Sequence, residues 1–346
     1  MQQQTPNSPR LMKRVVVSSG LREADIRPPA LMSEFKRLSV HDAAEYFRDP
    51  ASRVETACPA CDGADRDPAF DKYGFQYNRC RACGSVFVSP RPTAEALENY
   101  YTHSNASRFR VEHFSRDTAK ARRYHLLSSH ASWMCQAYDE AGNREARVYA
   151  DLYTHSPLIF DEVHALGVFD TLYSVDPILS PQGETQAPVR VVAESAARGL
   201  GAVSAFEKME HQFAPAAFLR AAAAMLAPGG LFFFTTRTIS GFDLQVLWDK
   251  TPYIFAPEHL NLMSIEGLGQ LVARCGMELI ELSTPGQLDL QLVEHAARQD
   301  PSIELPAFVR YLIEERDALA HEDFQAFLQK HRLSSHVRVA ARKTKE

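Results

Sequence analysis

The second half of the chain alternates short apolar runs with helical segments, and this alternation limits the fold more than any other feature. The short runs predict strands, and longer segments with helical periodicity lie between most of them. Strands that alternate with helices are typical of a parallel sheet with crossover helices, so an α/β fold is expected. The predicted strands are 147–152, 171–175, 189–193, 202–206, 231–236 and 277–283, with a closing edge strand at 336–342.

The rest of the chain divides around this region by its composition. The first fifty residues show no strong period, with short helices expected near 31–38 and 39–47. The segment that follows is rich in loops and cysteines, and a charged, helical stretch then leads into the α/β region. The predicted units are an N-terminal extension at 1–50, a cysteine-bearing module at 51–105, a helical linker at 106–145 and the α/β domain at 146–346, with a helical insertion at about 294–332.

Four of the six cysteines form two Cys-x-x-Cys pairs, Cys58 with Cys61 and Cys80 with Cys83. Eighteen residues separate the pairs, which is the spacing expected of a four-cysteine zinc ribbon. A redox dithiol would need only one such pair, and disulfides are not expected in a chain without an export signal. The spacing therefore predicts a structural zinc ion with four sulfur ligands and no open position for catalysis.

Three segments of the α/β region resemble motifs of the class I S-adenosylmethionine (SAM) methyltransferases. Residues 205–211, Ala-Phe-Glu-Lys-Met-Glu-His, are similar to the family's fourth strand and the Glu-His that follows it. Residues 226–231, Leu-Ala-Pro-Gly-Gly-Leu, match the turn before the fifth strand, and 173–177, Tyr-Ser-Val-Asp-Pro, resemble the second strand. The resemblance implies a Rossmann-like, seven-stranded sheet. A four-cysteine ribbon ahead of such a domain is similar to bacterial methyltransferases of sugar pathways, among them the sugar C-methyltransferases.

The resemblance implies that SAM is the cofactor and that residues after the first, second and fourth strands hold it. The family, however, carries glycines at the places of Tyr153, His155 and Pro157, where the backbone approaches the methionine part of SAM. Side chains there are expected to project into the cofactor volume, and Pro157 removes an N–H donor. Two hypotheses stay open: a methyltransferase, or a related protein that binds a ligand or scaffolds a partner enzyme without methyl transfer. The implied cofactor-binding residues are Asp151, Tyr153, His155, Asp176 and Glu207.

The candidate catalytic residues lie after the fourth and fifth strands. Glu258 and His259 occupy the place of a Tyr-x-Glu-His motif in the sugar C-methyltransferases, with Ala256 in place of the tyrosine. A histidine beside a carboxylate titrates near neutral pH and can accept a proton from a sugar carbon or hydroxyl. His211 follows Glu210 at the edge where open α/β sheets bind ligands. For each histidine, a role in packing its loop remains the alternative.

Charge and hydropathy narrow the expected partners. A net charge of −5 and a pI of about 6.2 disfavour broad nucleic-acid binding, and with it an RNA-modifying enzyme. No apolar run is long enough to predict a membrane span, and the polar N-terminus lacks the apolar stretch of a secretion signal. A cytoplasmic protein with a small, sugar-linked substrate is expected, and a partner protein or a homo-oligomer is left open.

Overall fold

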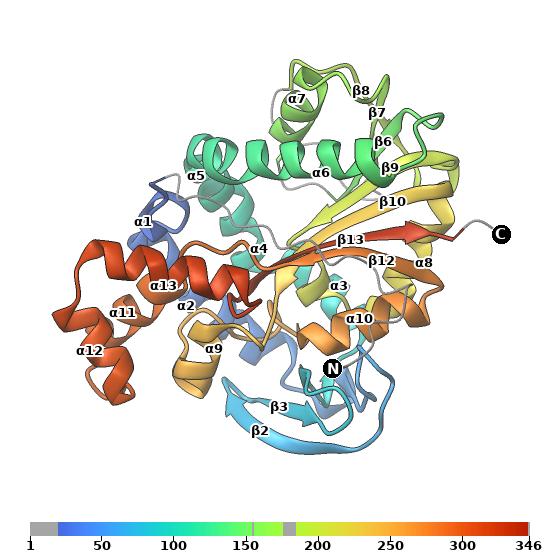
Figure 1. The fold of residues 1–346 in the computed structure, drawn as a ribbon. Helices are drawn as coiled ribbons and strands as arrows, with labels where there is room; N and C mark the ends of the chain where they lie inside the picture. Colours follow the sequence, from blue (N-terminus) through green and yellow to red (C-terminus); the bar gives the residue numbers. More distant parts are fainter. Residues whose placement is uncertain (1–19, 154–155, 176–184, 345–346) are drawn as a thin grey trace, which may run out of the picture.

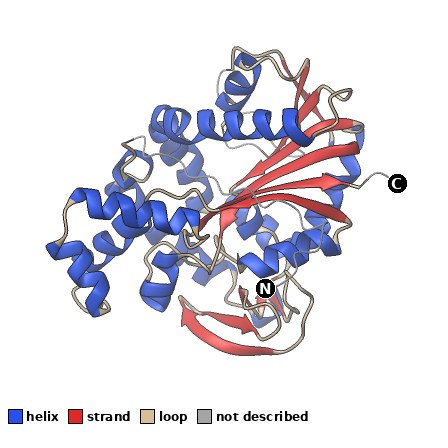
Figure 2. Cartoon of the chain, in the orientation of Figure 1, coloured by secondary structure: helices blue, strands red, loops and turns tan. Residues whose placement is uncertain are grey.

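The structure is a computed structural model and describes residues 20–153, 156–175 and 185–344 (Figure 1). A large twisted sheet lies at its centre with helices on both faces, and a smaller sheet lies beside it (Figure 2). His155 and Asp176, two of the predicted cofactor-binding residues, lie outside the described residues.

The large sheet has seven strands in the order β12-β13-β10-β9-β6-β7-β8. All are parallel except β13, which pairs antiparallel with both β10 and β12. The predicted α/β fold with a seven-stranded methyltransferase-type sheet is thereby confirmed. The strand order reverses between β6 and β9, so a crevice for ligands is expected outside their carboxyl ends. The strands are β6 (Val148–Leu152), β7 (Thr171–Val175), β8 (Val189–Val192), β9 (Leu200–Phe206), β10 (Leu226–Arg237), β12 (Met277–Ser283) and β13 (His336–Lys343).

Three consecutive phenylalanines of β10 show how both faces of this sheet are buried. Successive side chains of a strand point to opposite faces. Phe233 therefore packs against Trp133 of α6, with ring centroids 5.3 Å apart, while Phe232 and Phe234 lie in the core on the other face. Full burial of one such side chain contributes roughly 1.5–3 kcal/mol, so this central strand stabilises both layers. The first face carries α6 (Ser128–Ala141) and α7 (Leu158–Ala165), and the second carries α8 (Pro215–Met225) and α10 (Ile265–Arg274).

The small sheet joins two parts of the chain that lie far apart in the sequence. Its strands pair antiparallel in the order β11-β4-β3-β2. Three of them come from the cysteine-bearing segment, but β11 follows β10 of the large sheet. The cysteine-bearing segment is therefore built into the same packed structure as the large sheet. The strands are β2 (Arg66–Lys72), β3 (Phe75–Cys80), β4 (Val86–Val88) and β11 (Asn261–Leu262), beside a short pair of β1 (Arg53–Val54) and β5 (Arg91–Pro92).

Several helices from the first half of the chain lie toward the left in Figure 1, where the parallel strands end. α2 (Pro29–Tyr46) is one helix of 18 residues and not the two short helices predicted, because no glycine or proline interrupts it after its first residue. The helical stretch before α6 contains two π-helical turns, Arg110–Ser115 and Arg123–Leu127. Such turns are frequent at functional sites. The other helices are α1 (Glu23–Ile26), α3 (Ala94–His103), α4 (Asn105–Phe109) and α5 (Arg116–Arg122).

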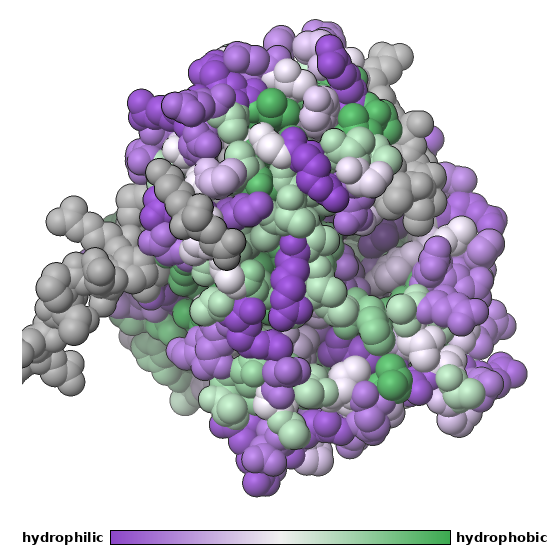
Figure 3. All heavy atoms as spheres, turned by 90° about the vertical axis from the view of Figure 1, so that its right-hand side faces the viewer, coloured by the Kyte–Doolittle hydropathy of each residue, from purple (hydrophilic) through white to green (hydrophobic). Residues whose placement is uncertain are grey.

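Four further helices pack on the same side of the molecule. One lies between β10 and β11 in the sequence, and three lie between β12 and β13. The region predicted as a helical insertion, at about 294–332, contains α12 and α13. No helix within the described ranges is both long and apolar enough to cross a membrane. On the face seen in Figure 3, strongly hydrophobic residues form small separate groups among hydrophilic ones, as is normal for a protein surface. These helices are α9 (Phe242–Leu247), α11 (Asp289–Gln299), α12 (Ala307–Glu315) and α13 (Ala318–Lys330).

Candidate functional site

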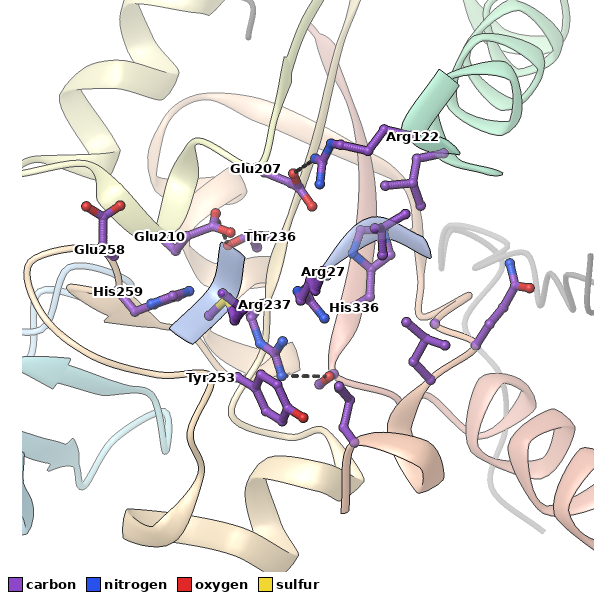
Figure 4. A pocket seen from close by; sticks show the side chains of 18 of the residues that line it. Arg27, Arg122, Glu207, Glu210, Thr236, Arg237, Tyr253, Glu258, His259 and His336 are labelled. Carbon is purple, nitrogen blue, oxygen red and sulfur yellow. Dashed lines mark hydrogen bonds and ion pairs between the residues drawn. The ribbon is translucent and has the colours of Figure 1, made fainter. Parts of the chain in front are cut away.

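A cavity of about 220 Å³, which we name the first chamber, opens at the carboxyl edge of the large sheet (Figure 4). Its floor comes from the ends of β9 and β10 and from the start of β13, which runs the opposite way. Residues of α1 and α2, the first π-helical turn and the loops after β10 and β12 form its walls. Segments from all parts of the chain thus meet where an open α/β sheet binds its ligands.

A second chamber, of about 170 Å³, lies outside the ends of β6 and β9. Asp151, Ser156 and Phe206 line it, so it occupies the point where the strand order reverses. The two chambers have seven lining residues in common and are therefore neighbouring parts of one hollow. The shared residues are Arg110, Phe114, Arg122, Leu126, His130, Glu207 and His211.

Glu207 stands on the boundary between the chambers. It follows β9 in a left-handed backbone conformation, with φ of +54°, and its N–H donates to the backbone and side chain of Thr235. Burial alone would raise the pKa of Glu207, but the guanidinium of Arg122, 2.5 Å away, and then His336 hold that pKa below its usual range. Glu207 is therefore a carboxylate, and it is available for a cation or a hydrogen-bond donor on either side.

Glu210 is a functional candidate that the sequence prediction left out in favour of its neighbour His211. Its side chain is only 4% exposed, and its carboxylate accepts a hydrogen bond of 2.8 Å from the Thr236 hydroxyl. Burial raises the pKa of Glu210 to about 7. A carboxyl group with this pKa can accept a proton at neutral pH, as a general base must. The sequence signal that could have found it is the Glu-His pair after the fourth strand.

Glu258 and His259 lie next to each other but face different surroundings. Glu258 is buried, its carboxylate is 3.0 Å from Arg110, and the Tyr100 hydroxyl donates to it over 3.3 Å. His211 is 3.8 Å from the same carboxylate, which is too long for a hydrogen bond. Burial raises the pKa of Glu258 and the Arg110 charge opposes this rise. These contacts make Glu258 an anchor that ties the first π-helical turn to the loop after β10.

His259 points into the first chamber beside Glu210 (Figure 4). Its Nδ1 lies 3.3 Å from the carbonyl of Phe255, so Nδ1 carries the proton and Nε2 keeps a lone pair. Burial, and then the charge of Arg237, lower the pKa of His259 to about 3. The ring is therefore neutral at physiological pH and acts better as a hydrogen-bond acceptor for a substrate than as a base. The structure thus brings Glu207, Glu210, His211 and His259 to one chamber.

Asp151 and Tyr153, which begin the predicted cofactor loop, have different surroundings. Asp151 is buried at the end of β6, where its carboxylate accepts a hydrogen bond from Ser204 and lines the second chamber. Tyr153 has φ of +54°, the left-handed conformation that a glycine adopts without strain. Its ring packs against Phe218, with centroids 6.2 Å apart, and its hydroxyl lies 3.4 Å from Glu194, which follows β8. The Tyr153 side chain therefore crosses the strand ends between β6 and β8 and leaves the second chamber open.

The four predicted metal ligands form a compact cluster. The Sγ atoms of Cys58 and Cys83 are 3.6 Å apart, those of Cys61 and Cys80 are 3.4 Å apart, and all four lie within 4.8 Å of one another. Four sulfurs at about 2.3 Å from a tetrahedral zinc ion are about 3.8 Å apart, so the cluster fits this metal. Glycine supports the second knuckle, where Gly84 has φ of +75°. The predicted four-cysteine cluster is thus present and consistent with zinc binding.

The cluster is attached to the α/β part of the molecule by direct hydrogen bonds. Ser264, at the start of α10, donates from its hydroxyl to the Cys83 carbonyl over 2.5 Å and from its N–H to the Ser85 hydroxyl over 3.0 Å. Arg274 donates to the Ala60 carbonyl over 2.8 Å. On the other side of the small sheet, the Tyr77 hydroxyl donates to the His259 carbonyl over 2.9 Å. The small sheet therefore fixes the backbone that carries His259.

The comparison with protein families agrees with this topology. Residues 144–282 match the family model described as a methyltransferase domain, and this range runs from β6 almost to the end of β12. The strand order of the large sheet is consistent with this match. Residues 144–282 are therefore similar to a methyltransferase domain, and we refer to the segment by that name. The four-cysteine cluster precedes this methyltransferase domain in the sequence and packs against it.

Solved structures with a similar fold are distant in sequence. One chain of the complex between the Haloferax volcanii Trm112 methyltransferase activator and a methyltransferase is 15% identical, with 66% of this chain and 96% of that chain covered and a TM-score of 0.41. Cyclopropane synthase MmaA2 from Mycobacterium tuberculosis is 15% identical, with 61% and 83% covered and a TM-score of 0.36. Geranyl diphosphate methyltransferase in complex with SAM is 14% identical, with 67% and 92% covered and a TM-score of 0.39. No curated protein matches the chain.

Proposed function

We propose that the protein transfers the methyl group of SAM to a small molecule held in the first chamber. The observation that carries this proposal is the continuity of the two chambers, which share Glu207 and His211. A donor bound outside β6 and β9 and an acceptor bound outside β10 would meet at these residues. The methyltransferase domain at 144–282 supports the same reaction class.

The residues of the second chamber fit one half of SAM. Asp151 and Glu207 offer carboxylates at the strand ends, where the amino group of the methionine part would bind. When bound, SAM supplies an electrophilic methyl group on a positively charged sulfur. The role proposed for His155 and Asp176 as further cofactor-binding residues follows from the family resemblance alone, because both lie outside the described residues.

The side chains around the first chamber would handle the acceptor. Glu210 accepts the proton that leaves the acceptor's hydroxyl or carbon, and Thr236 holds its carboxylate in place. His259 orients the acceptor through its Nε2 lone pair. Glu258 and Arg110 act as positioning residues, since they fix the walls on both sides. This assigns the base to Glu210 and leaves His211 and His259 to bind substrate.

We further propose a sugar or nucleotide-linked sugar of a bacterial biosynthetic pathway as the acceptor. Tyr253 and Phe255 give the first chamber aromatic lining residues, and carboxylate and imidazole groups line the same chamber. Sugars bind between such groups because their C–H faces pack on rings while their hydroxyls reach polar groups. The four-cysteine cluster ahead of the methyltransferase domain supports this choice through its resemblance to the sugar methyltransferases.

A second candidate function is ligand binding without methyl transfer, and the Tyr153 side chain favours it. The ribose of the cofactor is expected at the end of the second strand, β7. The Tyr153 hydroxyl reaches Glu194 beyond β8, so the side chain spans that strand end. A protein with this region closed would keep the first chamber for a ligand and lose the cofactor.

Calorimetric titration with SAM and with its demethylated product distinguishes the two candidates. Binding to the wild-type protein in the micromolar range supports methyl transfer, and no binding at millimolar ligand rules it out. Tyr153→Gly removes the crossing side chain while keeping the left-handed backbone, so a gain of SAM binding only in this variant supports the second candidate. Tyr73→Gly is the matched control, because Tyr73 also has a positive φ, of +50°, but is 40% exposed on the turn between β2 and β3.

A further inference from the structure

The first chamber is lined by arginines as well as by carboxylates. Five arginines line it, and three of them are paired with carboxylates. These pairs are Arg110 with Glu258, Arg122 with Glu207, and Arg237 with Asp243. Arg27 has no ion pair with any residue that the structure describes, although it is partly buried beside the chamber. The remaining lining arginine is Arg338.

Arg237 lines the chamber and has a hydrogen-bond donor that no described residue satisfies. It ends β10 and is 9% exposed, and its Nη2 is 2.5 Å from Asp243 and 3.3 Å from the Ser335 hydroxyl. Its buried Nε has no hydrogen-bond partner among the described residues. A buried guanidinium with an unused N–H is costly unless a ligand satisfies it. Asp243 compensates part of the charge of Arg237, so a second cation is needed to hold an anion beside it.

Arg27 lies near Arg237 and Tyr253 in the chamber (Figure 4). Its guanidinium lies 5.9 Å from the centre of the Tyr253 ring. Burial, and then the nearby charge of Arg237, lower the pKa of Arg27. The guanidinium stays protonated, because an arginine keeps its proton in proteins. Two cations that repel each other across a cavity create a site that favours an anion.

Arg27 is carried by an anchored segment and not by a loose one. Glu23 of α1 is buried, and its carboxylate contacts His295 Nδ1 at 2.7 Å and the Tyr253 hydroxyl at 3.1 Å. The N–H of Glu23 also donates to Gln291 over 2.8 Å. These contacts tie α1 to α11 and to the loop after β10, so the position of Arg27 over the chamber is part of the fold.

We propose that Arg27 and Arg237 together bind an oxyanion group, a carboxylate or a phosphate, on the molecule that accepts the methyl group. This inference builds on the proposed function, because it names the chemical class of that acceptor. Guanidinium groups bind both oxyanions through charge-assisted hydrogen bonds. Thr236, which donates a hydrogen bond to Glu210, is followed directly by Arg237, and all three residues line the first chamber. The proposed base and the proposed anion site therefore belong to the same cavity. An acceptor anchored by its anion thus presents a neighbouring hydroxyl or carbon to Glu210.

Binding of simple anions in the absence of SAM tests this site directly. Inorganic phosphate, glucose 1-phosphate and malonate are titrated by calorimetry and by thermal denaturation. We expect at least one to bind the wild-type protein, and Arg27→Gln to weaken that binding by about tenfold or more. Arg27→Lys, which keeps the charge, is expected to retain part of it. The preference between malonate and the two phosphates shows which oxyanion the site takes.

Arg22→Gln is the matched control. Arg22 stands beside the same short helix but is exposed and pairs only with Asp25 among the described residues, so its loss should leave anion binding unchanged. The proposal is overturned if no anion binds the wild-type protein at millimolar concentration, or if Arg27→Gln and Arg22→Gln bind equally well. Because no SAM is present, failure of SAM binding would remove the proposed methyl transfer and leave this anion site standing.

Discussion

At the scale of single residues, Glu210 shows how a candidate catalytic group can lower the stability of the fold. The native state holds its proton more tightly than the unfolded chain does, because burial raises the pKa from its ordinary value of 4.5 to about 7. The folded protein must therefore give up stability to ionise this carboxyl group. An ionisable group that is kept buried at such a cost, on the wall of a cavity, is a functional candidate.

The pH dependence of stability measures this cost. Between pH 4.5 and about 7 the native state binds the extra proton, so stability falls as the pH rises through this range. Glu210→Gln keeps the shape and the hydrogen bond to Thr236 but cannot ionise. We expect it to be more stable than the wild-type protein above pH 7, by roughly 3 kcal/mol, and equally stable below pH 4.5. Denaturant titrations at a series of pH values measure the difference.

Glu98→Gln serves as the control for this prediction. Glu98 is exposed on α3, so Glu98→Gln measures the effect of losing a carboxyl group at the surface. If Glu210→Gln behaves in the same way, Glu210 ionises freely and is not a buried base. Once an acceptor is identified, the rate of methyl transfer should rise with pH through about 7, because only the carboxylate accepts a proton.

Single residues also show where sequence reasoning reaches its limit. Spacing alone predicted the four cysteines, because two short turns must aim all four sulfurs at one metal. Arg27 could not be found in this way, since it lies in a segment without periodicity and reaches the chamber only through tertiary packing. Tyr153 was expected to project into the cofactor volume, and the structure adds that its ring packs against Phe218, which comes from a helix 65 positions further along the chain. Such a direction depends on packing that local sequence does not encode.

At the scale of secondary-structure elements, the ion pair between Arg110 and Glu258 links a helical segment to a loop that is far away in the sequence. Arg110 belongs to the first π-helical turn and is 22% exposed, whereas Glu258 is 3% exposed in the loop after β10. Removing one partner of a buried pair leaves the other charge uncompensated. The pair therefore controls how the wall helix sits against the chamber.

We expect Arg110→Met to destabilise the protein by about 3 kcal/mol or more, because Glu258 would be left buried without its cation. The double variant with Glu258→Met should recover most of this loss. Arg116→Met is the control, because Arg116 and Asp117 are 70% and 45% exposed and such surface pairs contribute less than about 1 kcal/mol. Unfolding free energies from urea titration give all three values. A loss in Arg110→Met no larger than that in Arg116→Met would show that the wall is held by other contacts.

Secondary structure was predictable where apolar residues follow a clear local pattern. The strands of the large sheet were found because each is a short apolar run between turn-forming residues. β11 was missed, since two residues, Asn261 and Leu262, carry no period and become a strand only by pairing with β4. The same holds for the π-helical turns, whose extra residue is invisible in composition. Elements made by long-range pairing thus lie beyond what local patterns predict.

At the scale of the whole molecule, the four-cysteine cluster and the large sheet share one hydrophobic core. Cys58, Cys80 and Cys83 belong to the same cluster of buried side chains as Phe232 and Leu271. β11 and the hydrogen bonds of Ser264 add a second connection. A metal that closes this cluster should therefore stabilise the methyltransferase domain as well as the small sheet.

Removal of zinc tests this coupling, and the two tryptophans report on it separately. Trp248 packs against Phe70 of the small sheet, and Trp133 packs against Phe233 of the large one, each with ring centroids 5.3 Å apart. Variants with one tryptophan each, Trp133→Phe and Trp248→Phe, give each part its own fluorescence signal. We expect a chelator, or Cys61→Ser, to lower both unfolding midpoints by the same amount, because a shared core unfolds as one cooperative unit.

The control for this experiment is Cys275→Ser, since Cys275 lies outside the cluster and should leave the metal content at one zinc per chain. A fall of the Trp248 midpoint alone would mean that the small sheet melts independently. In that case zinc would stabilise only the small sheet. The hydrogen bond from Tyr77 to His259 would then not be enough to destabilise the large sheet when zinc is removed. Equal shifts would instead make zinc a condition for the geometry of the first chamber, because the backbone of His259 and β11 are both held by the sheet that the cluster closes.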